Sequence, residues 1–119
     1  RGSSTSRGLG DVYKRQVETF VALGARFSFS GYFASDDKSK KRAAFDRVPL
    51  DRLLIESDAP DMLGPEELML EELRDKNGRP INSPLNLPRI YEYVAGMRNM
   101  SLEMLIPVVA ENFETFFHR

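Results

Sequence analysis

Two carboxylates follow a short apolar segment near the middle of this sequence. Residues 53–55 read Leu-Leu-Ile, and Glu56 and Asp58 come directly after them, before Pro60 ends the run. A short apolar run is typical of a strand covered on both faces, as in a parallel sheet, and alternation then puts Glu56 and Asp58 on one side. In a barrel of such strands, Asp58 would lie at the carboxyl end, where (β/α) barrels build their active sites. Asp58 is therefore the leading candidate for a catalytic residue.

Each of these carboxylates has a second interpretation. Asp58 could instead be a structural residue that caps the turn after the strand. Glu56 is expected to point inward, one layer deeper, where a buried carboxylate must be hydrogen-bonded or paired to offset its desolvation. We therefore expect a structural role for Glu56 and a chemical role for Asp58.

Another strand is predicted at residues 26–30, where phenylalanines alternate with serines. The alternation directs the phenylalanines toward a layer of helices, and Ser28 and Ser30 toward a narrow barrel interior. We expect these serines to serve close packing rather than nucleophilic attack, because the sequence holds no histidine placed to activate a serine.

The helices expected around these strands follow from capping and breaking residues. One helix should end at Gly24, and a second should begin at Asp36 or Asp37 and carry a basic cluster at residues 38–42. This cluster could contact a phosphate backbone, although a charge run on a helix is more often a solvated face.

Further helical segments are expected after the second strand. One should run from Pro65 to Asn77, where it either shapes substrate access or packs against the barrel rim. A helix then begins near Asn86. Near the end of the chain, Pro107 should divide the helical segment that begins at Ser101, since proline in a helix interior costs about 3 kcal/mol.

Taken together, these segments resemble the TatD family of metal-dependent hydrolases. Residues 26–31 are similar to the family's penultimate barrel strand, and residues 49–60 to its last strand with the signature Glu-Ser/Thr-Asp-Ala/Ser-Pro. Residues 82–88 resemble the Asn-x-Pro stretch that leads into its last long helix. The C-terminal end of the family is matched by residues 101–103, 111–112 and 116–117. The resemblance covers nearly everything after Gln16.

The resemblance implies an α/β fold, namely the C-terminal part of a (β/α)8 TIM-type barrel of the metal-dependent hydrolase kind. Such a barrel takes roughly 250 residues, so a chain of 119 residues can supply only its last part. The family's metal site combines a His-x-His pair, a glutamate and two more histidines from earlier strands with the aspartate of the last strand. Only that aspartate, Asp58, has a counterpart here, and His118 lies where no family ligand belongs.

The resemblance therefore assigns Asp58 as both a metal ligand and a catalytic residue. It implies one or two divalent metal ions as cofactors (Zn, Mg or Mn), with most ligands missing from this chain. The implied activity is metal-dependent hydrolysis of ester bonds, with DNA phosphodiesters as the main substrate. A TatD-scaffold esterase or deacylase is one alternative, and a noncatalytic α/β interaction module is another. We expect the full-length parent to be an enzyme and the truncated chain to be inactive.

Residues 1–16 lie outside the resemblance to the TatD family. Residues 1–16 resemble one translated frame of the adapter that transposase-based sequencing kits attach to DNA fragments; the alternative is a disordered tail rich in Gly, Ser and Arg. We therefore expect a non-native, disordered leader at residues 1–16 and the C-terminal portion of a TatD-like barrel at residues 17–119.

The composition agrees with part of a cytoplasmic enzyme. The sequence has no cysteine, which excludes disulfides and thiolate zinc ligands. No apolar run approaches the roughly 18 residues that suggest a membrane span. The formal net charge is −1, and the leader holds four basic residues and one acidic residue, so residues 17–119 carry −4. This charge is poor for a dedicated nucleic-acid binder and ordinary for a hydrolase whose metal ions meet the substrate charge. We expect DNA as the parent's substrate, no membrane association and no specific protein partner.

Overall fold

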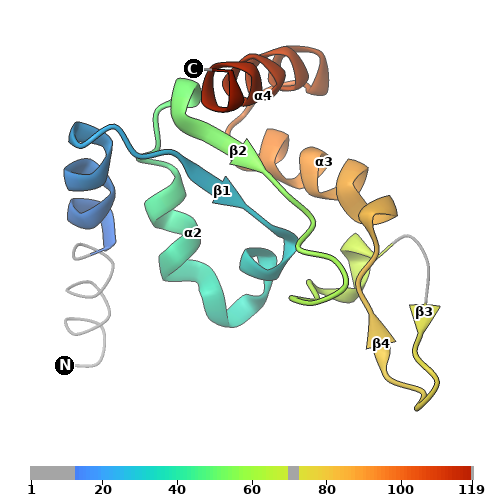
Figure 1. The fold of residues 1–119 in the computed structure, drawn as a ribbon. Coiled ribbons are helices and arrows are strands. Elements are labelled where there is room, and N and C mark those ends of the chain that lie inside the picture. The colour runs from blue at the N-terminus through green and yellow to red at the C-terminus, as the bar shows by residue number, and fades with distance from the viewer. Residues whose placement is uncertain (1–12, 70–72, 119) are drawn as a thin grey trace, which may run out of the picture.

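A pair of parallel strands forms the centre of the fold (Figure 1). Strand β1 (Phe27–Phe29) pairs in parallel with β2 (Leu53–Ile55). The chain passes from one to the other through α2 (Ser39–Phe45), because parallel neighbours need a crossover connection. Both strands and the crossover helix lie where the sequence predicted them, and they make the chain mixed α/β.

The computed structural model describes residues 13–69 and 73–118. The other elements are a helix at residues 13–22, 3-10 segments at Gly31–Ala34, Asp36–Lys38, Leu50–Arg52, Glu66–Leu68 and Pro84–Asn86, a hairpin of β3 (Leu73–Arg74) and β4 (Pro80–Ile81), and helices α3 (Leu87–Met97) and α4 (Leu102–Phe117). The hairpin projects away from the strand pair, at the lower right of Figure 1. Within these described ranges, no helix has the combined length and apolar character needed to cross a membrane.

The helix at residues 13–22 ends as the sequence predicted. Gly24 follows it with φ +87°, the left-handed conformation that favours glycine. Val17 is buried and packs in the core. The expected leader overlaps this helix, because residues 13–16 are helical, whereas residues 1–12 lie outside the described part of the chain. The leader's boundary at residue 16 stays a prediction.

Phe29 occupies the centre of the core, on the face of β1 that the helices cover. The residue is fully buried. Its ring centroid lies 5.0 Å from that of Phe45, at the end of α2, and 5.9 Å from that of Tyr93, in α3. Such aromatic pairs add about 0.5–1.5 kcal/mol each beyond the apolar area that they bury. Phe29 therefore joins the strand pair to both helices, as the alternation in the strand predicted.

Helix α4 is continuous, and the predicted break at Pro107 is wrong. The helix runs from Leu102 to Phe117 with Pro107 inside it, and Ser101 caps its first turn. Leu105 and Val109, on either side of the proline, are fully buried. Burial of each of these side chains contributes about 1.5–3 kcal/mol, so together they outweigh the roughly 3 kcal/mol that an interior proline costs.

The predicted helix after Pro65 is also wrong. Only the single turn Glu66–Leu68 forms, and the hairpin of β3 and β4 follows it. The apolar stripe that suggested a helix consists of Met69, Leu70 and Leu73, and Leu70 lies outside the described residues. Met69 is half-buried, whereas Leu73 in β3 is exposed, so these side chains do not share one buried helix face.

The hairpin turn explains why the strands replace the helix. Gly78 adopts φ +79°, and its backbone N–H donates to the carbonyl of Asp75 over 3.0 Å. The Asp75 carboxylate accepts hydrogen bonds from the backbone N–H groups of Asn77 (2.8 Å) and Arg79 (2.9 Å). An Asn-Gly pair between short strands is a strong hairpin signal, and here it prevails over a weak helical stripe.

Candidate active site

Asp58 lies just beyond β2, at the edge where both parallel strands end. Its backbone has φ +56°, a left-handed conformation that costs a non-glycine residue about 1–2 kcal/mol. The Asp58 carbonyl accepts a hydrogen bond of 3.0 Å from the backbone N–H of Asp61, and the residue is partly exposed. Strained backbone is typical of functional sites, where the surrounding contacts hold it in place.

Glu56 interacts with Asp58 but is exposed, and the buried position predicted for it is wrong. The backbone N–H of Glu56 still donates to the carbonyl of Phe29 over 2.9 Å, but within the described residues no element covers its side chain. Partial desolvation raises the pKa of the Glu56 carboxyl, a hydrogen bond with Asp58 raises it further, and a hydrogen bond with Ser28 acts in the opposite direction. Two adjacent carboxylates repel each other when both are ionised, and a bound cation would relieve this repulsion.

The two serines of the first strand differ in their surroundings. Ser28 lies close enough to Glu56 to lower the pKa of that carboxyl, on the face away from the helices. Ser30 is fully buried just after β1, and its Oγ has no hydrogen-bond partner within the described residues. Neither serine lies beside a histidine in the described part of the chain, in keeping with the packing role predicted for them.

Asn82 holds the loop that carries Asp58. Its side-chain Nδ2 donates to the carbonyls of Ser57 and Asp61, the latter over 2.8 Å. Its backbone N–H donates to the carbonyl of Pro60 over 3.0 Å. A single residue therefore satisfies carbonyl groups on both sides of Asp58.

The Asn82 amide is itself fixed by its neighbours. Its Oδ1 accepts hydrogen bonds from the backbone N–H of Ser83 (2.9 Å) and from Nδ2 of Asn86 (3.0 Å). Asn86 also donates to the sulfur of Met69 over 3.1 Å, and both asparagines are buried. In the sequence these asparagines stand out only as part of a family motif, because the loop carbonyls that Asn82 binds lie far from it along the chain.

Two glycines fix the far end of the same loop. A Cβ atom added at Gly64 would lie 2.7 Å from the carbonyl oxygen of Gly31, closer than side chains normally approach a backbone. Gly31 begins the turn after β1, so the loop that follows β2 rests directly on the end of β1. The backbone around Asp58 is thus held at one end by Asn82 and at the other by this glycine contact.

The predicted basic cluster is largely engaged in contacts within the chain. Lys38 lies 4.9 Å from the ring centroid of Tyr32 and 3.4 Å from a carboxylate oxygen of Asp37. Arg42 donates to the carbonyls of Phe33 and Ser35. Lys38 and Arg42 are thus half-buried in contacts within the chain rather than fully solvated, and phosphate contact by the cluster stays a prediction.

His118 lies at the end of α4, where its Nε2 is 3.5 Å from a carboxylate oxygen of Glu114. Both side chains are highly exposed.

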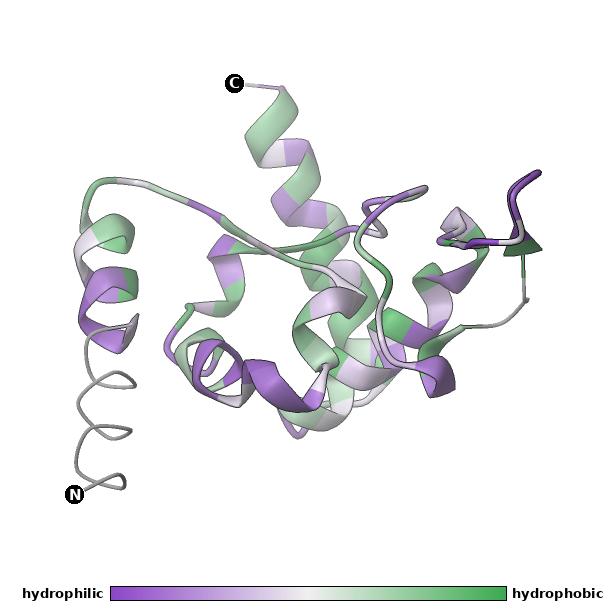
Figure 2. Cartoon of the chain, turned by 90° about the horizontal axis from the view of Figure 1, so that it is seen from below, coloured by the Kyte–Doolittle hydropathy of each residue, from purple (hydrophilic) through white to green (hydrophobic). Residues whose placement is uncertain are grey.

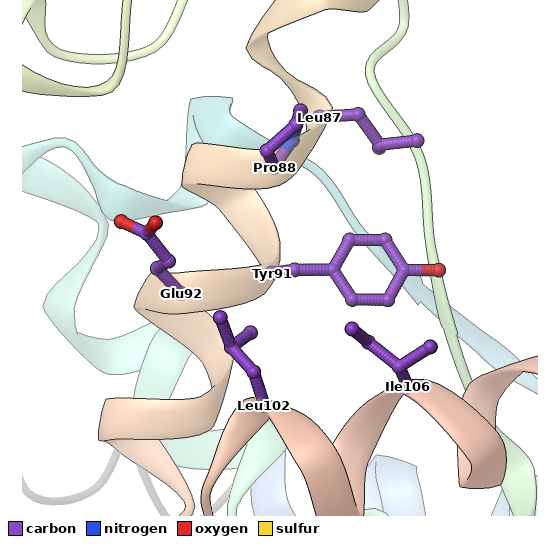
Figure 3. A pocket seen from close by; sticks show the side chains of 6 residues that line it. All are labelled: Leu87, Pro88, Tyr91, Glu92, Leu102 and Ile106. Carbon is purple, nitrogen blue, oxygen red and sulfur yellow. The ribbon is translucent and has the colours of Figure 1, made fainter.

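An apolar pocket of about 290 Å³ lies between α3 and α4 (Figure 3). It is lined by Leu87, Pro88, Tyr91, Glu92, Leu102 and Ile106. Glu92 is its one carboxylate, and none of the residues that hold the Asp58 loop lines it. The pocket lacks the convergent polar groups of a catalytic site, so Asp58 and its loop are the stronger candidate.

The described residues do not form a metal site by themselves. They contain no group of three or more histidine, cysteine, aspartate or glutamate side chains that could hold a metal ion. Asp58 and Glu56 offer hard oxygen ligands, which suit divalent cations, but a complete site requires at least four ligands. Asp58 fits the role of one ligand among several.

Comparison with known proteins identifies the family. The sequence matches the family described as TatD related DNase over residues 12–118. The chain belongs to the TatD family. This TatD chain is 34% identical over 96 residues to the uncharacterized metal-dependent hydrolase YcfH of Escherichia coli K12, a match that covers 81% of the chain and 32% of the relative. It is 31% identical over 106 residues to the 3'-5' ssDNA/RNA exonuclease TatD of Pantoea vagans, covering 86% of the chain and 37% of the relative.

Solved structures agree with this TatD assignment. The crystal structure of the TatD homologue YjjV from Escherichia coli matches with a TM-score of 0.67 and 27% identity, over 89% of this chain and 37% of that one. A TatD family hydrolase from Entamoeba histolytica matches with the same TM-score at 17% identity, over 85% and 38%. The TatD chain therefore shares its mixed α/β fold with part of these structures, a likeness that implies a TIM-barrel-type metal hydrolase fold, and it spans about a third of the length of the curated relatives it matches.

Proposed function

We propose that this chain is the C-terminal part of a divalent-metal-dependent hydrolase that cleaves DNA phosphodiesters, with Asp58 as a metal ligand and proton acceptor. The observation that carries the proposal is the position of Asp58 at the carboxyl end of β2, in a left-handed conformation held by Asn82. The exonuclease name of the Pantoea relative favours a nucleic-acid substrate over a carboxylic ester.

The proposed chemistry follows from the position of this carboxylate. A divalent ion, when bound, lowers the pKa of a water molecule so that hydroxide is available at neutral pH. One oxygen of the Asp58 carboxylate would hold the ion, and the other would orient the attacking water and accept its proton. Glu56, beside it, adds negative charge that favours cation binding.

The remaining ligands must come from outside the described residues. We use "the parent" for the proposed longer protein that joins this chain to the upstream barrel strands present in its relatives. The parent should supply a His-x-His pair, a glutamate and two more histidines, with Zn, Mg or Mn as the metal. The cytoplasmic location expected from the cysteine-free sequence stays a prediction.

The test is to extend the reading frame upstream of Val17 and to assay the protein that the extended frame encodes. We expect the parent to cleave labelled single-stranded DNA in the presence of Mn²⁺. Asp58→Asn should lower kcat by about 10²-fold or more, the scale of general-base loss, with little change in melting temperature. Asp46→Asn, which changes an exposed aspartate at the end of α2, is the matched control.

Three results would count against the proposal. Near-normal turnover by Asp58→Asn would remove the catalytic assignment. An upstream frame without the expected histidines would favour a noncatalytic protein. Faster cleavage of carboxylic esters than of DNA would favour the esterase alternative.

A further inference from the structure

We infer that Asn82 is a positioning residue for Asp58, because its amide fixes the loop backbone on both sides of that residue. This inference rests on the proposed function, since it takes Asp58 to be the reacting carboxylate. It gives a role to Asn82, which lies far from Asp58 in the sequence and outside β2.

Asn82 makes three hydrogen bonds to the loop that carries Asp58. Nδ2 of Asn82 donates to the carbonyls of Ser57 and Asp61, and its backbone N–H donates to the carbonyl of Pro60. Asp58 lies between these anchored carbonyls with φ +56°. A residue in this sparsely populated conformation stays there only when its surroundings hold it, and Asn82 makes three of the bonds that do so.

The orientation of the Asn82 amide is fixed by two donors to its oxygen. The backbone N–H of Ser83 and the side-chain Nδ2 of Asn86 both donate to its Oδ1. These donors require the oxygen to face them, so the NH₂ group must face the loop. A flipped amide would place its oxygen against the carbonyls of Ser57 and Asp61, where nothing could be donated.

Both asparagines of this network are buried. Asn82 is 5% exposed and Asn86 is 1% exposed, so water does not readily replace their hydrogen bonds. Buried polar groups that lose a partner cost about 1–3 kcal/mol, which favours a single arrangement of the network. Because Asn86 directly precedes α3, the network ties the Asp58 loop to the start of that helix.

The consequence for catalysis is the precision with which the carboxylate is presented. A displacement of about 1 Å in a reacting group can cost about 10²-fold in rate. Groups that orient metal ligands typically change metal affinity or activity by about 10- to 100-fold when they are replaced. We therefore expect Asn82 to act on kcat and metal affinity rather than on substrate binding.

The experiment compares Asn82→Asp with Asp58→Asn in the parent. Asn82→Asp keeps the acceptor for Ser83 and Asn86 but removes the amide donor to the loop. We expect it to lower kcat and the affinity for Mn²⁺, measured by calorimetry, by about 10- to 100-fold each. The KM for the oligonucleotide should change less than about threefold. Hydrogen exchange of the Asp61 amide, which bonds to the Asp58 carbonyl, should accelerate, because it reports opening of the loop directly.

Two further variants keep the result interpretable. Asn77→Asp makes the same substitution at an exposed position on the hairpin turn, and it should behave like the parent in every readout. If Asn82→Asp does not fold, Asn86→Leu removes the donor to Asn82 Oδ1 together with the bond to the sulfur of Met69, and it should give a smaller loss in kcat and Mn²⁺ affinity.

The outcomes separate the two proposals. If Asp58→Asn loses activity while Asn82→Asp keeps parental kcat and Mn²⁺ affinity, the positioning role is overturned and the proposed function stands. If Asp58→Asn keeps both, the proposed function fails and the positioning role with it. A loss in Asn82→Asp that is fully explained by the unfolded fraction of the sample would also overturn the positioning role.

Discussion

The side-chain amide of Asn112, in α4, donates a hydrogen bond of 2.8 Å to the backbone carbonyl of Leu53, the first residue of β2. The same nitrogen donates to the carbonyl of Leu50 over 2.7 Å, and Asn112 is 5% exposed. One buried side chain thus joins the last helix to the strand that leads to Asp58.

Replacing Asn112 with leucine should destabilise the parent without altering its chemistry. The substitution leaves two carbonyls without their donor in a buried position, which costs about 1–3 kcal/mol for each unsatisfied group. Urea unfolding should report the loss, with Glu111→Gln at the exposed neighbouring position as the control. A variant as stable as the parent would show that water or another donor replaces the amide.

Gly64→Ala should also destabilise the parent, because its new methyl group would lie 2.7 Å from the backbone oxygen of Gly31. Overpacking of this kind typically costs about 1–3 kcal/mol. Gly96→Ala, in α3, is the matched control, since a Cβ there has no neighbouring atom within 4 Å. Alanine should stabilise that helix by about 0.5–1 kcal/mol. Opposite shifts in melting temperature are expected, and equal shifts would contradict the close contact.

Tyr91 should make stability fall at alkaline pH. Burial against the apolar wall in Figure 3 raises the pKa of its hydroxyl above the usual value of 10.0. The folded state then holds the proton more tightly than the unfolded state, so the stabilisation is present below about pH 10 and is lost as pH rises through the folded pKa. The melting-temperature difference between the parent and Tyr91→Phe should be constant from pH 7 to 9 and shift in favour of the variant above 10. A constant difference up to pH 11 would contradict this.

The chain by itself should not hydrolyse DNA. Its described residues contain no group of three or more metal-ligating acidic, histidine or cysteine side chains. The assay is cleavage of labelled single-stranded DNA with manganese, magnesium or zinc. Robust turnover that disappears in Asp58→Ala would show that the chain carries a complete site.

The isolated chain should also self-associate. Phe117 is 65% exposed and Met104 is 62% exposed on α4, whose C-terminal end is coloured hydrophobic in Figure 2. Within the described residues, β1 and β2 form a sheet of only two strands, whose outer edges are open to pairing with other chains. Sedimentation velocity should detect oligomers or aggregates. A monomer with a sharp, cooperative thermal transition would contradict this expectation.

Local patterns predicted the elements whose signals lie within a few residues. The alternation around Phe29 and the apolar run at residues 53–55 gave β1 and β2, and Gly24 ended the first helix. The sequence failed where distant contacts decide the outcome. Burial of Leu105 and Val109 keeps α4 continuous through its proline, which no local rule anticipates.

The candidate site could be predicted only in part. Asp58 is identified as a candidate from its place after an apolar strand. The role of Asn82 could not be predicted, because its partners are backbone carbonyls at positions 57, 60 and 61, which carry no side-chain signature. The alternation places Glu56 on the same face as Ser28 and Asp58, but the two-stranded sheet of the described residues leaves that face uncovered, so Glu56 is exposed rather than buried.

The bond from the Asn82 backbone to the Pro60 carbonyl has a consequence for how such enzymes diverge. It joins the two ends of the excursion at residues 61–81, so the hairpin within this excursion is a closed appendage. Each doubling of a flexible loop's length costs only about 0.6 kcal/mol. Descendants of one ancestral gene can therefore extend or trim the hairpin of β3 and β4, while the contacts of Gly64 and Asn82 keep Asp58 in its place.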